Sequence, residues 1–168
     1  LGGGGAYELL YFLTRYIKPN IIVETGVAAG FSSKAFLVAI SKNKKGKLYS
    51  SDFPYFREEN AEKYIGLLVD DIYKKNWDFF KEGDINFLKT LKDKIKPSSI
   101  DLFHYDSDKS SEGRMFSYPK LWNHLREGGI FISDDISDNE GFKKFCEEME
   151  LSPLIIKDGN KYQGILKK

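Results

Sequence analysis

The sequence predicts an α/β fold in which helices cover both faces of one mostly parallel sheet. Short apolar runs alternate with amphipathic segments five times, which is typical of repeated strand–helix units. Each predicted parallel strand is also followed by at least one carboxylate. The chain ends in two predicted strands, 151–157 and 161–167, separated by Asp158-Gly159, a strong turn signal. We therefore expect a doubly wound, Rossmann-like sheet of order 3-2-1-4-5-7-6, closed by an antiparallel C-terminal hairpin, in one domain spanning 1–168.

The first part of the chain predicts two helices and two strands. Helix 6–17 is amphipathic and ends before Pro19, whose ring cannot continue a helix. The apolar run 20–25 predicts a buried strand. Segment 31–42 then has helical periodicity, and 46–52 is predicted to be the second strand.

The middle of the chain continues the alternation. Segment 57–75 is polar and is predicted to be helical. The third strand is predicted at 77–84 and is followed by a helix at 85–95. The buried run 99–106 is predicted to be the fourth strand.

The last strand–helix pairs precede the hairpin. A helix is predicted at 112–127 although it crosses Pro119, so we expect a bend or a late start there. The fifth strand is predicted at 128–135, followed by helix 138–150 with Cys146 on its core-facing side.

Composition and charge limit the function classes. Lys plus Arg number 26 and Asp plus Glu 25, so a net charge of +1 gives no overall attraction to nucleic acid or anionic membranes. The single cysteine excludes an internal disulfide and a cysteine-based zinc site, and it fits a reducing compartment. We expect no nucleic-acid or membrane partner, while a homodimer is permitted.

The N-terminal segment shows no targeting signal. Its start, LGGGGAYELL, has no basic region, and YELLYFL is too short to span a bilayer. A cytoplasmic protein is therefore expected. Residues 1–19 are interpreted as an N-terminal helix that is either complete or the remainder of a truncated lid.

The turn ETGVAAGFSS follows the first strand and separates it from a helix. A dinucleotide-binding turn reads G-x-G-x-x-G, but here Glu24 occupies the first glycine position and the later spacing is one residue too long. A Walker loop would continue with Gly-Lys-Ser/Thr, whereas Gly30 is followed by Phe31. The turn therefore disfavours a polyphosphate ligand.

The pattern Glu-x-Gly-x-x-x-Gly-x-Ser instead resembles motif I of class I S-adenosylmethionine (SAM)-dependent methyltransferases. Gly26 and Gly30 would let the backbone approach the methionine part of that cofactor. Ser32 and the N–H groups at the helix start would hold its carboxylate. Glu24 would pair with its ammonium group, directly or through water.

Residues after the next strands extend this interpretation. Asp52 is placed to accept both ribose hydroxyls, and Phe53 to cover the adenine. Asp84 would accept from the adenine amino group, and Ile85 and Asp106 complete the predicted cofactor residues. A lone acid after a strand is more often a helix cap, so the prediction depends on the joint order across three strand ends.

Four carboxylates follow the fourth and fifth strands. In the expected strand order these strands are neighbours, so Asp106, Asp108, Asp134 and Asp135 should gather at one rim. Ligands that are all oxygen favour Mg²⁺, Mn²⁺ or Ca²⁺ over zinc. The alternative is that Asp108 or Asp135 caps the next helix and faces water.

The stretch from about 20 to 166 resembles methyltransferase family 24, the group with macrocin-type sugar O-methyltransferases and relatives of catechol O-methyltransferase. The matching pieces are ETGVAAGFSS, GKLYSSDFP, GDINFLKTL, DLFHYDSDKSSEGRMFSYPKLWNHLREGGIFISDD and the final hairpin. The resemblance implies that Asp106, Asp134 and Asp135 bind a divalent metal, with Mg²⁺ the expected ion, and that Asp108 is the general base.

One position departs from the family pattern. Many relatives have histidine and an aromatic residue in DSDHSY, where this chain has Lys109, Ser110 and Ser111. Lys109 could act as the base, hold an anionic substrate or repel a metal. We therefore place Lys109 beside Asp108 as a candidate catalytic residue.

These features favour SAM-dependent O-methylation of a small hydroxylated molecule, such as a sugar or natural product, with divalent metal assistance. Tyr55, Phe56 and Phe116 suggest a flat or sugar-like acceptor. One alternative is a SAM-binding domain without catalysis. Another is a nucleic-acid methyltransferase, but the SDFPYF stretch follows the wrong strand for its motif, and we interpret the basic segment 42–47 as a solvated loop.

Overall fold

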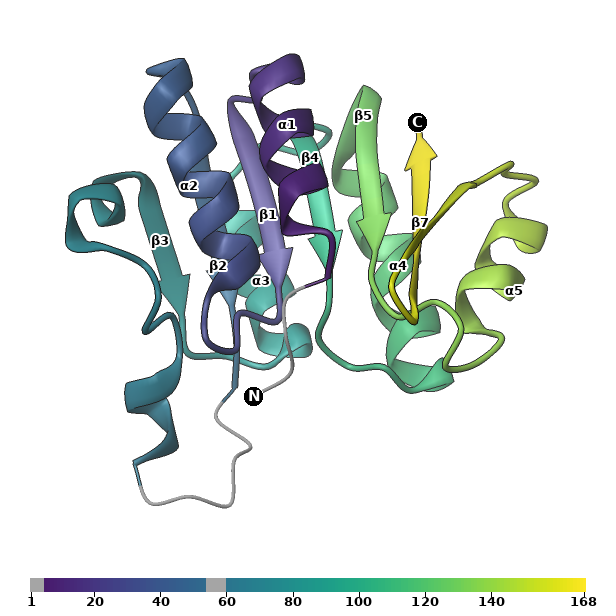
Figure 1. Cartoon of the computed structure of the whole chain (residues 1–168). Helices are drawn as coiled ribbons and strands as arrows, with labels where there is room; N and C mark the ends of the chain where they lie inside the picture. Colours follow the sequence, from purple (N-terminus) through teal and green to yellow (C-terminus); the bar gives the residue numbers. More distant parts are fainter. Residues whose placement is uncertain (1–4, 54–59) are drawn as a thin grey trace.

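Seven strands form one mixed sheet at the centre of this computed structural model, which describes residues 5–53 and 60–168 (Figure 1). The strands are β1 (Ile21–Thr25), β2 (Lys47–Ser51), β3 (Trp77–Phe80), β4 (Ile100–Tyr105), β5 (Leu125–Ser133), β6 (Leu154–Asp158) and β7 (Lys161–Lys167). Their order is β3-β2-β1-β4-β5-β7-β6, as predicted. The first five strands are parallel, and β7 pairs antiparallel with both β5 and β6.

Helices cover both faces of the sheet. They are α1 (Tyr7–Ile17), α2 (Phe31–Asn43), α3 (Asp84–Lys94), α4 (Ser111–His124) and α5 (Gly141–Glu148), with 3₁₀ turns η1 (Ala61–Tyr64) and η2 (Asp71–Asn76). Helices α1 and α2 pack on one face, and α3, α4 and α5 on the other (Figure 1). Within the described residues, no helix combines the length and apolar character needed to cross a membrane.

Adjacent residues of one strand supply the two cores, because successive side chains of a strand point to opposite faces. Ile22 packs with Leu10 of α1 and Phe36 of α2, whereas Val23 packs in the core beneath α3, α4 and α5. Both faces are thus covered at the centre of the sheet, where all six residues of β4 are buried. This packing holds the carboxyl ends of the strands in a fixed arrangement.

Several predicted boundaries differ from the structure, and among them β5 begins at Leu125, inside the helix predicted at 112–127. Residues 60–76 form two 3₁₀ turns rather than the expected α-helix, and Gly66 interrupts them with a φ of +69°. A Cβ at Gly66 would lie 2.5 Å from the Trp77 ring, so this segment packs too closely for a regular helix. Helix α4 begins at Ser111, before Pro119, so the late start is wrong. Strand β3 ends at Phe80, four residues before the predicted end at 84, and Asp84 is the first residue of α3.

Candidate functional site

The predicted site residues lie where the parallel strands end. Because β1 to β5 are parallel, their carboxyl ends meet at one edge of the sheet, to which the arrowheads in Figure 1 point. The basic segment 42–47 lies at the opposite edge, where α2 ends and β2 begins. Tyr55 and Phe56, two of the predicted acceptor contacts, fall outside the described residues.

The turn between β1 and α2 requires glycine at two positions. Gly26 has a φ of +85°, and a Cβ there would lie 2.2 Å from the carbonyl oxygen of Asp106. Gly30 has a φ of +94°, and a Cβ there would lie 3.0 Å from the Cα of Gly66. No side chain caps the N-terminus of α2. The turn therefore presents a helix N-terminus of the kind that binds carboxylates and other anions.

Glu24 lies beneath this turn and is fully buried. Its carboxylate accepts hydrogen bonds from the hydroxyls of Ser32 at 2.6 Å, Ser33 at 2.5 Å and Ser50 at 2.7 Å. The sequence predicts that Ser32 binds the carboxylate of the cofactor and Glu24 its ammonium group. In the structure, the Ser32 hydroxyl instead donates a hydrogen bond to Glu24. Glu24 thus orients the first turn of α2.

Asp52 follows β2 and supports the same turn from the side. Its Oδ2 atom accepts from the backbone N–H groups of Val27 at 2.9 Å and Ala28 at 2.7 Å. Burial raises the pKa of Asp52, although the backbone N–H groups act in the opposite direction. The predicted ribose acceptor therefore also fixes the shape of the glycine turn.

Asp84, the first residue of α3, is tied to the ends of two strands. The Ser107 hydroxyl bonds to Asp84 Oδ2 at 2.7 Å and to the hydroxyl of Thr25 at 3.0 Å. Burial raises the pKa of Asp84. The predicted cofactor residues Phe53 and Ile85 are 58% and 56% exposed, so both are accessible to a ligand. Sequence reasoning missed Ser107, which follows one residue after the expected end of the fourth strand.

Asp106, Asp134 and Asp135 come together as predicted. Each offers one carboxylate oxygen, and these oxygens lie within 4.8 Å of one another. Asp134 and Asp135 are buried, and burial raises the pKa of Asp106 to about 6. Asp108 is exposed and lies outside this group, where its Oδ1 atom accepts from the Ser110 N–H at 2.9 Å.

Two lysines enter the three-carboxylate cluster of Asp106, Asp134 and Asp135. Lys109 bonds to Asp135 Oδ2 and lies 3.3 Å from Asp106 Oδ1. Lys161 of β7 lies 3.2 Å from Asp135 Oδ1 and 3.6 Å from Asp134 Oδ2. Burial lowers the pKa of Lys109, but Asp106 and Asp135 raise it more, so the net shift is upward.

The geometry of the oxygens suits a divalent ion, but the charges around them do not. The ammonium groups of Lys109 and Lys161 already form ion pairs with the same carboxylates, and a divalent ion there would be repelled by both. The predicted Mg²⁺ does not fit this arrangement of side chains. We therefore assign the metal no role in the chemistry proposed below.

Three further residues around the cluster were missed. Gln163 donates to Asp134 Oδ1 at 3.1 Å, and Arg114 is fully buried and donates to the backbone carbonyls of Asp135 at 2.8 Å and Asp134 at 3.3 Å. Lys161 and Gln163 lie beside the end of β5 because β7 pairs with it antiparallel. The predicted strand order already places the last strand of the hairpin beside the fifth strand. That pairing could have identified Lys161 and Gln163 as neighbours of the cluster.

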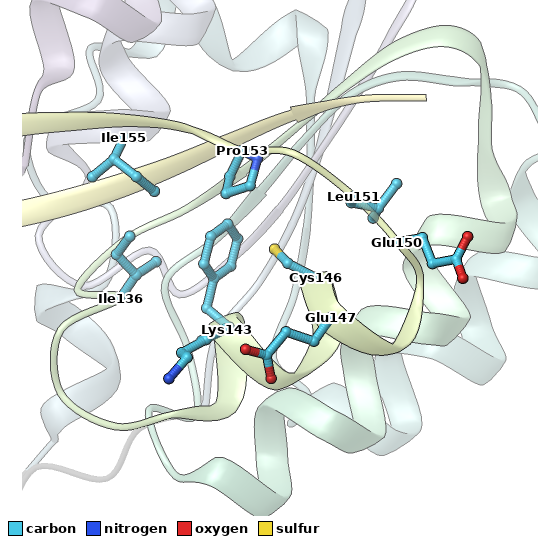
Figure 2. A pocket seen from close by; sticks show the side chains of 9 residues that line it. Ile136, Lys143, Cys146, Glu147, Glu150, Leu151, Pro153 and Ile155 are labelled. Carbon is cyan, nitrogen blue, oxygen red and sulfur yellow. The ribbon is translucent and has the colours of Figure 1, made fainter.

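A separate apolar cavity of about 410 Å³ lies between α5 and β6 (Figure 2). It is lined by Ile136, Phe142, Lys143, Cys146, Glu147, Glu150, Leu151, Pro153 and Ile155. None of the predicted site residues lines it. Burial raises the pKa of Cys146 to about 11, so the thiol stays protonated at neutral pH, in keeping with its predicted packing role.

Solved structures share the fold over nearly the whole chain. A protein from Klebsiella pneumoniae described as an O-methyltransferase superposes with a TM-score of 0.74 at 16% identity, covering 99% of this chain and 82% of its own. TomG of Streptomyces achromogenes, an O-methyltransferase of tomaymycin synthesis solved with SAM, gives 0.74 at 16% identity, covering 96% and 79%. An O-methyltransferase of Bacillus cereus, solved with S-adenosylhomocysteine (SAH), gives 0.73 at 14% identity, covering 96% and 80%. At these identities the likeness shows the fold.

Family membership comes from the sequence itself. No curated protein matches the chain. A family model described as a methyltransferase domain matches residues 23–136, more than half of the chain. The matched segment begins in β1 and ends just after Asp134 and Asp135, so it contains the glycine turn and the three-carboxylate cluster. The chain therefore belongs to methyltransferase family 24 and has the class I methyltransferase fold.

Proposed function

We propose that this protein transfers a methyl group from SAM to a hydroxyl group of a small molecule, such as a sugar or a natural product. The observation that carries the proposal is the glycine turn at the end of β1, which leaves the N-terminus of α2 without a side-chain cap. Acidic residues at two neighbouring strand ends flank this turn. Structural relatives solved with SAM or SAH are O-methyltransferases, which supports the same assignment.

Each part of the cofactor has a matching group on this edge of the sheet. The N–H groups of α2 would stabilise the carboxylate of the methionine part. Glu24 contributes indirectly, since it holds the Ser32 hydroxyl at 2.6 Å and so orients the helix start. Asp52 would accept from the ribose, and Asp84 from the adenine amino group, with Phe53 and Ile85 beside the ring.

Bound SAM supplies an electrophilic methyl group on a positively charged sulfur. The protein then has to hold the acceptor oxygen in line and remove its proton. Correct alignment alone can supply about 7–11 kcal/mol of barrier lowering.

The acceptor is proposed to bind at the three-carboxylate cluster. The Lys109 ammonium would donate a hydrogen bond to the acceptor oxygen. Asp106, whose pKa of about 6 lies near neutral pH, would accept the proton. Asp108 is exposed and two residues from Asp106, and its role as general base stays a prediction.

A second candidate is a domain that binds SAM without transferring the methyl group. The ion pairs of Lys109 and Lys161 favour it, because they occupy the carboxylates that would otherwise bind a metal. Direct measurement separates the two. We expect SAH to bind in isothermal titration calorimetry, and an SAH-release assay with phenols, catechols and sugars to identify an acceptor.

The outcomes of these two measurements have distinct meanings. Absence of SAH binding would refute both candidates. Binding without turnover on any acceptor would favour the non-catalytic domain, and release of SAH with one acceptor class would establish transfer.

A further inference from the structure

We propose that the ammonium groups of Lys109 and Lys161 take the place of the divalent cation that the family resemblance implies among Asp106, Asp134 and Asp135. The protein would then bind no divalent metal at this cluster. This inference concerns ion binding, so it stands whether or not methyl transfer is demonstrated.

Ion pairs already involve all three carboxylates of the cluster. Asp135 contacts both lysines, Asp106 contacts Lys109 at 3.3 Å, and Asp134 contacts Lys161 at 3.6 Å. Every carboxylate of the predicted ligand set therefore already has an ammonium partner. A divalent ion would have to displace these contacts to reach the same oxygens, since Mg²⁺ binds oxygen at about 2.0–2.1 Å.

The charges of the side chains around the cluster also disfavour a divalent ion. The three carboxylates form ion pairs with the ammonium groups of Lys109 and Lys161. The guanidinium of Arg114, which is fully buried, donates instead to the backbone carbonyls of Asp134 and Asp135. Two ammonium groups thus offset most of the negative charge of the three carboxylates. Adding a divalent ion would place a net positive charge beside Asp134 and Asp135, which are buried, and screening by solvent is weaker for buried charges.

The two lysines come from separate parts of the chain. Lys109 lies in the loop after β4, and Lys161 begins β7. Their convergence requires β7 to pair with β5, and Gln163 on the same strand adds a bond to Asp134 at 3.1 Å. The hairpin therefore completes the cluster, with both lysines directed to its carboxylates.

If the proposed function holds, this replacement also limits the acceptor. A metal ion can chelate two neighbouring hydroxyls, whereas each ammonium donates separate hydrogen bonds. An acceptor with one reactive hydroxyl should then be methylated as readily as one with a vicinal pair, and EDTA should not reduce the rate; both expectations rest on the proposed methyl transfer.

Mn²⁺ binding tests the replacement directly. In electron paramagnetic resonance titrations, the wild-type protein should leave Mn²⁺ in its aqueous form. The double variant Lys109→Met/Lys161→Met should bind one Mn²⁺ at least about tenfold more tightly, because removing the two positive charges exposes the carboxylates. Lys167→Met, at the exposed far end of β7, is the matched control and should behave like wild type.

Thermal unfolding provides a second readout, since the double variant leaves three carboxylates without their partners. Mn²⁺ should raise the Tm of the double variant and leave the wild-type Tm unchanged, because a ligand bound to the folded state stabilises it. If the double variant does not fold, Lys161→Met alone should also bind Mn²⁺ more tightly than wild type and show a smaller rise in Tm with Mn²⁺.

Two results would overturn the proposal. One is stoichiometric Mn²⁺ binding by the wild-type protein that Asp134→Asn abolishes. The other is a folded lysine variant that binds Mn²⁺ no more tightly than wild type. Neither result depends on SAH binding, so failure here is distinguishable from failure of the proposed function.

Discussion

The carboxylate of Asp52 accepts a hydrogen bond from the backbone N–H of Ala28 at 2.7 Å, so the end of β2 supports the turn that follows β1. The Val27 N–H bonds to the same oxygen at 2.9 Å. An acid that the sequence assigns to the cofactor ribose is thus also a scaffold for the glycine turn.

Replacing Asp52 should weaken cofactor binding. We expect Asp52→Ala to reduce SAH affinity by about 1–3 kcal/mol, the cost of leaving hydrogen-bonding groups unpaired in a buried site. Isothermal titration calorimetry measures the change, and Asp93→Ala on the exposed side of α3 is the control. Unchanged affinity would refute the assignment of Asp52 to the ribose.

Replacing Glu24 should lower stability. Its carboxylate accepts from three buried hydroxyls, so Glu24→Ala should leave three donors unpaired and cost about 3 kcal/mol or more in the free energy of unfolding. Urea denaturation checks this, with the exposed Glu8→Ala as control. A loss below about 1 kcal/mol would mean that the serines find other partners.

Adding a methyl group at Gly26 should disrupt the turn. The new Cβ would lie 2.2 Å from the Asp106 carbonyl oxygen, at a φ of +85°. We expect Gly26→Ala to cost at least about 2 kcal/mol, from left-handed backbone strain together with overpacking. Gly83→Ala is the control, since nothing lies within 4 Å of its Cβ position. Equal unfolding midpoints for the two variants would contradict the close approach of β1 and β4.

Stability should fall as pH rises through the range in which Asp106 ionises. Burial raises the pKa of Asp106 from 3.8 to about 6, so the folded state retains a proton that the unfolded chain has lost. Protonated Asp106 therefore makes its full contribution to the free energy of unfolding below pH 3.8, and this contribution is lost as the pH rises towards 6. The change is at most about 3 kcal/mol, because each pKa unit corresponds to about 1.4 kcal/mol.

The difference between wild type and Asp106→Asn isolates this contribution. Urea denaturation between about pH 4 and pH 7 should show a wild-type loss of stability that the variant lacks. Asp138→Asn, an exposed acid near the same edge, should retain the wild-type profile. Parallel profiles for wild type and Asp106→Asn would contradict the raised pKa.

The sequence by itself determined the order of the helices and strands, and which residues lie at the edge of the sheet where the parallel strands end. Apolar runs and glycine turns are local signals, and a parallel sheet brings successive strand ends to one edge whatever the loops contain. The pattern ETGVAAGFSS therefore predicts the position of the turn, and the acids after β4 and β5 predict the position of the cluster.

Only the tertiary structure decided what those side chains touch. Glu24 bonds to serines from α2 and β2, and Lys161 reaches the acids after β5 from the far side of the hairpin turn. Such contacts depend on strand register and on the packing of distant segments, which no local pattern encodes. The same reason explains segment 60–76, where contact between Gly66 and Trp77 overrides the expected helix.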